Sequence, residues 1–133
     1  MSVDVEWHLE SVVTVEDRDR VVSLLQGHLQ RGDSLVALKL EVLARDTSRD
    51  INLRCRALET LTGVPGSLWS ERVRSLVGDL CMDSDYRVQL SAIAAATDLP
   101  KTDRDSLVCR VTQCGMNGSN RIALAARAFV LAG

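Results

Sequence analysis

The sequence contains few aromatic side chains and few prolines. Only 3% of its 133 residues are aromatic, and its two prolines are Pro65 and Pro100. With so few rings, a core has to be built from Leu, Val, Ala and Ile, the mixture expected of closely packed helices. Each proline follows a stretch with helical spacing by a few residues, where a proline helps to end a helix. These scarcities favour an all-α chain.

Long apolar runs are also absent. The longest uncharged run, from Thr60 to Ser70, has 11 residues and contains Gly and Pro, whereas a membrane-spanning helix needs about 20 apolar residues. The N-terminus carries acids where a secretory signal would carry basic residues, and no apolar segment follows them. We therefore expect a cytoplasmic protein whose four cysteines are reduced: Cys55, Cys81, Cys109 and Cys114.

Signatures of catalysis and metal binding are missing. The two histidines, His8 and His28, have no metal-ligand spacing to each other or to the cysteines. Cys109 and Cys114 are five positions apart, which is wider than the gap of the usual zinc knuckle. A nucleophilic cysteine would need a nearby base, and neither histidine is close to one in the sequence. We predict that the chain is not an enzyme and uses no metal or cofactor.

The charge is low and unevenly spread. The formal net charge is −2, which gives no electrostatic basis for binding nucleic acid. Residues 1–31 sum to −3, whereas residues 101–132 sum to +3. Such a polarity could steer a partner or favour head-to-tail association. The alternative is chance unevenness on a solvated surface.

Residues that favour helix starts recur every 17 or 18 positions. Each precedes apolar residues at helical spacing, and its side-chain oxygen can accept from the free N–H groups of a first turn. Two helices in 34 or 35 residues are typical of an α-solenoid, in which each unit packs on its neighbours. The residues are Asp33, Asp50, Ser67, Asp85, Thr102 and Ser119.

Pairing these helices predicts one domain, residues 1–133, with seven to eight antiparallel helices. The units are about 1–31, 33–63, 67–98 and 102–132, and the first unit contains a helix over about 16–30. Residues 1–13 fit two structures: alternation favours a strand, whereas Val5, Leu9, Val12 and Val13 fit one helix face. A lone strand in a helical array would lack a hydrogen-bonding partner, so we favour a helix.

The predicted second helices of the units are similar to one another. Residues 50–58 (DINLRCRAL) match residues 85–93 (DYRVQLSAI) at an offset of 35, and residues 122–126 (IALAA) continue the pattern. An acidic residue, then an aliphatic one, then small residues about four positions later resembles the second helix of HEAT-like repeats. The family's basic residue after the aliphatic one is kept at Arg54 but is Gln89 and Ala123 in later units. The resemblance implies a short right-handed α-solenoid, and the aromatic-rich tetratricopeptide pattern is absent.

In HEAT-like arrays the second helices line the concave face, so the resemblance implies a partner-binding surface there. Arginine suits recognition because its planar fork can hold a carboxylate or phosphate bidentately. The alternative is that many of these charges are solvated or form local ion pairs of little energetic weight. The candidates are Arg20, Arg54, Arg56, Glu59, Arg87, Gln89, Arg121 and Arg127.

The last predicted helix lacks a polar side. Residues 122–132 contain a single charge, Arg127, although the terminal helix of a solenoid normally has a polar outer face. The helix could pack on another copy or another protein, fold more deeply into its own array, or belong to a longer array. The candidate interface residues are Ile122, Phe129, Val130 and Leu131.

Two local features allow structural interpretations. The tripeptide Arg31-Gly32-Asp33 resembles an adhesion motif, but we expect Gly32 to end one helix and Asp33 to cap the next. Trp69 fits an exposed anchor or the edge of the core, and we favour the core.

The sequence therefore predicts a non-enzymatic protein-binding module with an adaptor, chaperone-like or immunity-type role. Its partner would be another protein or, through the last helix, a second copy. The alternatives are a nucleic-acid-binding HEAT-like array resembling alkylpurine DNA glycosylases, or a HEAT-like lyase. Those glycosylase arrays are longer, strongly basic and use aromatic residues, whereas this chain is short, slightly acidic and poor in aromatics.

Overall fold

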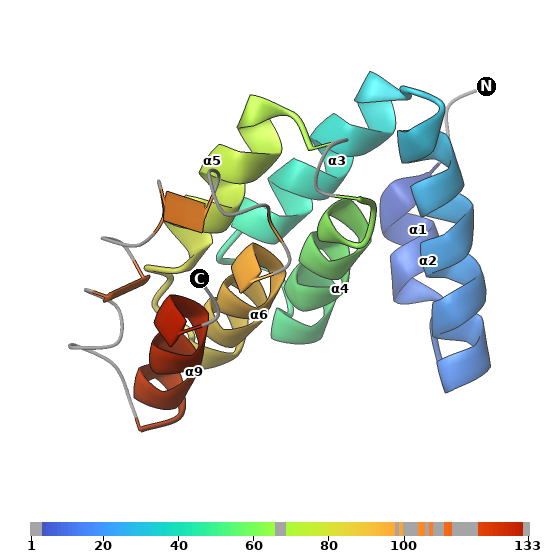
Figure 1. Cartoon of the computed structure of the whole chain (residues 1–133). Helices are drawn as coiled ribbons and strands as arrows, with labels where there is room; N and C mark the ends of the chain where they lie inside the picture. Colours follow the sequence, from blue (N-terminus) through green and yellow to red (C-terminus); the bar gives the residue numbers. More distant parts are fainter. Residues whose placement is uncertain are drawn as a thin grey trace. The chain divides into compact units, whose positions relative to one another are not determined.

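All regular secondary structure in the described part of the chain is helical. The computed structural model describes residues 4–65, 69–97, 99, 104–105, 107, 111–112 and 120–131, and none of these residues forms a strand. The chain divides into two compact units, Met1–Leu68 (unit 1) and Trp69–Gly133 (unit 2). The predicted all-α class is confirmed, and Figure 1 shows the helices of each unit in sequence colours.

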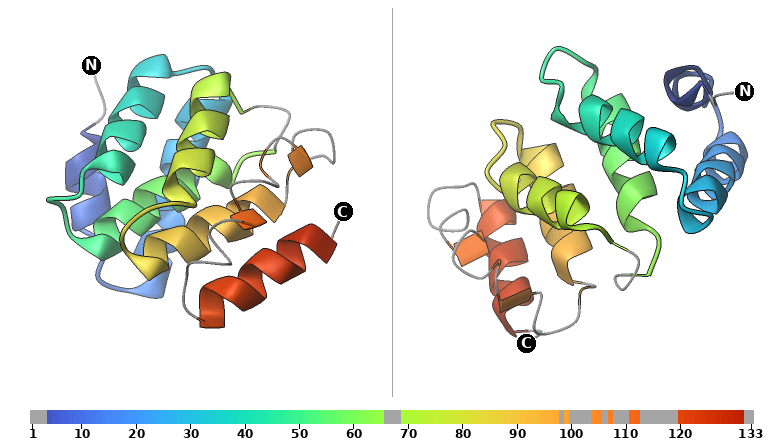
Figure 2. Two further views of the ribbon diagram at one scale, coloured as in Figure 1. Left: turned by 90° about the vertical axis from the view of Figure 1, so that its left-hand side faces the viewer. Right: turned by 90° about the horizontal axis from the view of Figure 1, so that it is seen from above.

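The described residues of unit 1 form four helices. They are α1 (Val5–Glu10), α2 (Val15–Gln30), α3 (Ser34–Arg45) and α4 (Ile51–Thr62). The antiparallel helices α3 and α4 make the most extensive contact with each other (Figure 2). Helix α2 also contacts α4, and α1 contacts the other three helices. Val5 and Leu9, one turn apart on α1, are almost fully buried. Within the predicted range 1–13, Val5–Glu10 therefore form a helix, as favoured from the sequence, whereas Val12 and Val13 lie beyond its end.

Unit 2 contains three named helices. They are α5 (Glu71–Leu80), α6 (Tyr86–Thr97) and α9 (Asn120–Leu131), and α6 contacts both of the others. Trp69, two residues before α5, is only 5% exposed. Its predicted place in the core is confirmed, so it is not an exposed anchor.

Three of the predicted helix starts are confirmed. The Asp33 carboxylate accepts from the Val36 N–H at 3.3 Å, and the Asp50 carboxylate accepts from the Asn52 N–H at 3.0 Å. At the start of α6, Asp85 accepts from the Arg87 N–H at 2.8 Å. Each carboxylate satisfies an N–H that has no partner within its own helix.

One helix start was predicted three residues too early. The sequence placed it at Ser67, but α5 begins at Glu71 and the Ser70 hydroxyl accepts from the Val73 N–H. Both serines are chemically fit to cap a helix, and only the packing of the following residues distinguishes them. Ser67, Thr102 and Ser119 lie outside the described residues.

The second helices of the pairs α3–α4 and α5–α6 correspond at several positions. Helices α4 and α6 have the same length and begin 35 residues apart, whereas the caps of α3 and α5 are 37 residues apart. The second helices of the two pairs thus match in length and spacing, whereas the first helices do not keep the same period. The matching buried residues of α4 and α6 are Leu53 and Val88, Ala57 and Ala92, Leu58 and Ile93, and Leu61 and Ala96.

Helices α2 and α3 are joined with almost no linker. Gly32 has φ +82°, the left-handed conformation that glycine adopts at helix ends. Its N–H donates to Leu29 O, and the Asp33 N–H donates to His28 O, which together form a Schellman motif. Asp33 also caps α3. The tripeptide at 31–33 thus ends α2 and begins α3, as predicted.

Two glycines of unit 1 should respond oppositely to alanine. A Cβ on Gly63 would overlap with Gln26 Nε2 and lie 3.0 Å from Glu59 O. Gln26 would have to move and lose its bond to Thr60 O, so we expect Gly63→Ala to lower the free energy of unfolding by about 1–2 kcal/mol.

Gly27→Ala is the matched control, since its Cβ would meet only the flexible end of Arg31 at 3.7 Å. Alanine within a helix should raise stability by roughly 0.5–1 kcal/mol. Urea unfolding of the two variants measures both effects. Equal changes of the same sign would contradict the close packing at Gly63.

Candidate functional site

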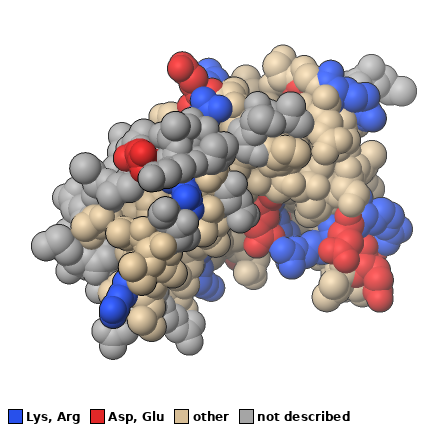
Figure 3. Space-filling model, in the orientation of Figure 1, with Lys and Arg blue, Asp and Glu red and all other residues tan. Residues whose placement is uncertain are grey.

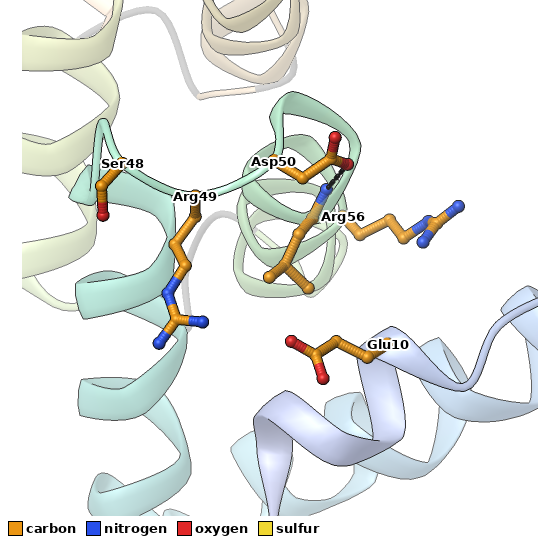
Figure 4. Close-up of a pocket in the computed structure, with 6 residues that line it drawn as sticks. Glu10, Ser48, Arg49, Asp50 and Arg56 are labelled. Carbon is orange, nitrogen blue, oxygen red and sulfur yellow. Dashed lines mark hydrogen bonds between the residues drawn. The ribbon is translucent and has the colours of Figure 1, made fainter.

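A cleft of about 380 Å³ opens in unit 1, between the end of α1 and the start of α4. Figure 4 shows that its walls come from α1, from the α3–α4 turn and from α4. The cleft is open to solvent and its lining is mostly charged, unlike the apolar pockets that enclose small molecules. It suits side chains that project from a partner. The lining residues are Glu10, Ser48, Arg49, Asp50, Leu53 and Arg56.

The α3–α4 turn is fixed by Asp46, which ends α3. Its Oδ1 accepts from the Ser48 N–H at 3.0 Å and from the Ser48 hydroxyl at 2.6 Å. This is the local bond pattern by which Asp stabilises turns. The hydrogen bonds from Ser48, with the nearby Arg49 charge, hold the pKa of the Asp46 carboxyl below its usual range.

Arg49 and Asp50 line the cleft but are already engaged within the unit. Arg49 forms ion pairs with Glu6 of α1 and with Asp46, the latter at 3.5 Å. Asp50 caps α4, and the dashed line in Figure 4 marks its bond to the Leu53 N–H. Both side chains therefore shape the cleft, and Arg49 also links the α3–α4 turn to α1 through Glu6.

Glu10 and Arg56 are the charges of the cleft that remain available. Neither forms an ion pair with any residue of the described part of the chain, although Arg49 and Asp50 beside them do. Arg56 is partly exposed and Glu10 is exposed. In Figure 4 the Arg56 side chain extends away from Arg49. The cleft thus presents one unpaired cation and one unpaired anion.

The capping carboxylates should make stability depend on pH. The pKa of Asp33 is lowered from 3.8, first by the Val36 N–H and also by His28, and that of Asp17 by its bonds to Thr14. A carboxyl with a lower pKa in the folded state stabilises the fold above its unfolded pKa, and this contribution is lost as the pH falls through the folded value. We expect urea unfolding to show decreasing stability below about pH 4.

Asp33→Asn is the control for this effect, because asparagine still caps a helix but does not titrate in this range. Its stability should fall less steeply between about pH 4 and pH 2 than that of the unsubstituted chain. An identical pH profile for both proteins would show that Asp33 does not contribute.

Three of the predicted partner-binding residues form local ion pairs. Arg20 pairs with Asp17 on its own helix, and Glu59 of α4 pairs with Arg18 of α2. Arg87 bonds to Asp85, the cap of α6, with Nη2 at 3.3 Å from the carboxylate. Exposed pairs of this kind are weak. Figure 3 shows basic and acidic side chains intermixed at the lower end of α2.

Arg54 does not belong to an exposed surface, and this prediction is corrected. Its side chain is only 2% exposed, and its Nε donates to Ala44 O at 3.0 Å. Ala44 is near the end of α3, where backbone carbonyls lack partners within their own helix. A cation at this end also interacts favourably with the helix dipole. Arg54 therefore caps α3 from the neighbouring helix.

Gln89 performs the corresponding task in unit 2. It occupies the position 35 residues after Arg54, and its Nε2 donates to Cys81 O at 3.3 Å. Cys81 is the C-terminal cap residue of α5. Arg54 and Gln89 thus each make a polar contact inside their own helix pair. The exposed binding surface predicted for Arg54 is wrong, whereas Gln89 is partly exposed and its role in partner binding stays a prediction.

The predicted interface of the last helix divides into two faces. Ile122 and Phe129 are 0% and 2% exposed, so they belong to the core of the chain and cannot form a free surface. Val130 and Leu131 are exposed, as predicted for an interface. Because the helix is apolar on both faces, the spacing of its apolar residues does not show which face is buried. Arg127 is exposed, and the Arg121 side chain lies outside the described residues.

Of the six cleft residues, only Arg56 was predicted from the sequence to bind a partner, and five were missed: Glu10, Ser48, Arg49, Asp50 and Leu53. They come from two segments about 38 positions apart, so no local pattern joins them. The one available signal was the Asp46-Thr47-Ser48 sequence, which favours a tight turn. The salt bridge from Arg49 to Glu6 required knowledge of how α1 packs.

In the described ranges, no three His, Cys, Asp or Glu side chains are grouped so as to hold a metal ion. Within the same ranges, no helix combines the length and apolar character that crossing a bilayer requires. Cys55 and Cys81 form no disulfide with any described residue, and Cys109 and Cys114 lie outside the described residues.

Comparison with known proteins yields no relative: no family model, no curated protein and no solved structure matches the chain.

Proposed function

We propose that this chain is a non-enzymatic protein-binding module, built as a short right-handed α-solenoid of HEAT-like helix pairs. Its role would be that of an adaptor, a chaperone-like protein or an immunity-type protein. The partner is another protein, and unit 1 carries the surface that recognises it.

The correspondence between the helix pairs supports the solenoid proposal. The pairs α3–α4 and α5–α6 bury matching positions on their second helices, and each contains a side chain that caps its first helix. Repeated pairs of this kind are the building blocks of α-solenoids, whose surfaces typically bind other macromolecules.

The observation that carries the functional proposal is the unpaired Arg56 in the cleft of unit 1. Arg56 has no ion-pair partner in the described part of the chain, in contrast to Arg18, Arg20, Arg49 and Arg87. A guanidinium in this setting can hold a carboxylate through two hydrogen bonds. Glu10, on the same cleft, adds a site for a cation.

The chemistry of the cleft favours a protein over a nucleic acid. Two carboxylates, Glu10 and Asp50, lie beside the two arginines and would repel a phosphate backbone. A protein segment with one acidic and one basic side chain matches Arg56 and Glu10 without such repulsion.

The test compares Arg56→Gln with Arg20→Gln. Both variants lose one exposed positive charge from unit 1, but Arg20 is paired with Asp17 and lies on α2. Proteins captured by the unsubstituted chain are identified, purified and titrated against both variants by calorimetry. We expect the dissociation constant to rise at least about tenfold for Arg56→Gln and to stay nearly unchanged for Arg20→Gln.

Two results would overturn this proposal. One is equal affinity of both variants for every captured protein. The other is binding to duplex DNA that weakens steeply with salt, which is the behaviour of a phosphate-binding protein.

A further inference from the structure

The outer face of α9 exposes apolar side chains beside positive charge. Leu124, Val130 and Leu131 are 67%, 46% and 73% exposed, and Arg127 is exposed among them. We call these four residues the α9 surface. The helix contains two arginines and no acidic residue. At the position of α9, the space-filling view is mostly uncharged and contains no acidic side chain (Figure 3).

Unit 1 exposes apolar side chains beside negative charge. Trp7, Val13 and Val15 are 61%, 87% and 71% exposed, and Glu10 and Glu16 are exposed in the same segment. We call these five residues the N-terminal surface. Residues 4–16 contain four acidic residues and neither Lys nor Arg. An exposed tryptophan is characteristic of the central residues of protein interfaces.

We propose that the α9 surface of one copy of this chain docks on the N-terminal surface of a second copy. Each surface is apolar and carries one sign of charge, and the signs are opposite. Opposite charges align the two surfaces, and the apolar side chains supply the burial.

The same charges disfavour symmetric pairing. Contact between two α9 surfaces would bring arginines together, and contact between two N-terminal surfaces would bring carboxylates together. Both kinds of contact are disfavoured, because like charges oppose association. The contact is therefore heterologous, with different surfaces on the two copies, and the resulting dimer retains one unused α9 surface and one unused N-terminal surface. This inference is tested separately from the proposed function, because it concerns self-association of the pure chain and does not require Arg56. Glu10 belongs to both the cleft and the N-terminal surface, and the variants below leave it unchanged.

Light scattering on the pure chain tests self-association directly. The mean mass should rise above that of one chain as the protein concentration increases. It should fall when salt is raised from about 0.1 M to about 1 M, where the screening length drops from ~10 Å to ~3 Å. A mass of one chain at every concentration and at both salt levels would overturn the proposal.

A mixing experiment tests the head-to-tail geometry. L124E/L131E blocks the α9 surface with acidic residues, and W7Q/V13Q removes the apolar part of the N-terminal surface. All four positions are exposed, so both variants should fold, which circular dichroism checks. Each variant alone should remain a single chain, because it lacks one of the two surfaces.

An equimolar mixture of the two variants should form a dimer and no larger species, because it retains one intact surface of each kind. Val42→Glu is the matched control, since Val42 is 56% exposed on α3 and belongs to neither surface. It should associate like the unsubstituted chain. A mixture that stays monomeric, or a Val42→Glu chain that no longer associates, would contradict the proposed contact.

Discussion

Replacing Arg54 by methionine is expected to lower the free energy of unfolding by about 2–3 kcal/mol. Methionine fills much of the buried volume, but it cannot donate to Ala44 O, to which Arg54 Nε donates at 3.0 Å. The carbonyl would then be left in a site where the present side chain is only 2% exposed. Urea unfolding measures the loss.

Arg54→Gln is the control suggested by the chain itself. At the corresponding position of the next helix pair, Gln89 donates to the C-terminal end of α5. Glutamine at position 54 should therefore recover part of the stability that methionine loses. If both variants unfolded at the same urea concentration as the unsubstituted chain, the capping role of Arg54 would be wrong.

Phe129→Ala is expected to lower the free energy of unfolding by about 3–5 kcal/mol. Its ring is 2% exposed on the face of α9 that also carries the buried Ile122 and Ala126. Removing it leaves a cavity that the neighbouring helices can fill only in part. Since small domains are marginally stable, thermal unfolding followed by circular dichroism should show a large decrease in midpoint.

Leu131→Ala is the matched control on the same helix, because Leu131 is 73% exposed. A surface substitution of this kind should change stability by no more than about 0.5 kcal/mol. If Phe129→Ala unfolded like Leu131→Ala and changed only the mass of the particle, then Phe129 would be an interface residue.

Helix positions were largely predictable because their signals are local. A capping side chain and the apolar spacing behind it lie within a few residues of each other, so Asp33 and Asp50 identified the starts of α3 and α4. The same local signal failed at Ser67, because Ser70 offers equivalent chemistry three residues later. The choice between them depends on which register buries Val73 and Leu76, and that is a matter of tertiary packing.

The roles of single polar residues were less predictable. Arg54 and Arg56 are two positions apart and equally basic, yet one is buried against α3 and the other lines the cleft. Helix spacing places them on different sides of α4, but it does not say which side meets another helix. The cleft itself depends on α1 lying near the α3–α4 turn.

The joint at Gly32 and Asp33 has a consequence for how unit 1 opens. The Asp33 N–H closes the end of α2 through His28 O, and its carboxylate closes the start of α3 through the Val36 N–H. If either helix end frays at this point, the other helix end also loses the hydrogen bond that Asp33 makes to it. The last turn of α2 and the first turn of α3 should therefore exchange their amide hydrogens together, as one cooperative segment, and an insertion between them should be tolerated poorly.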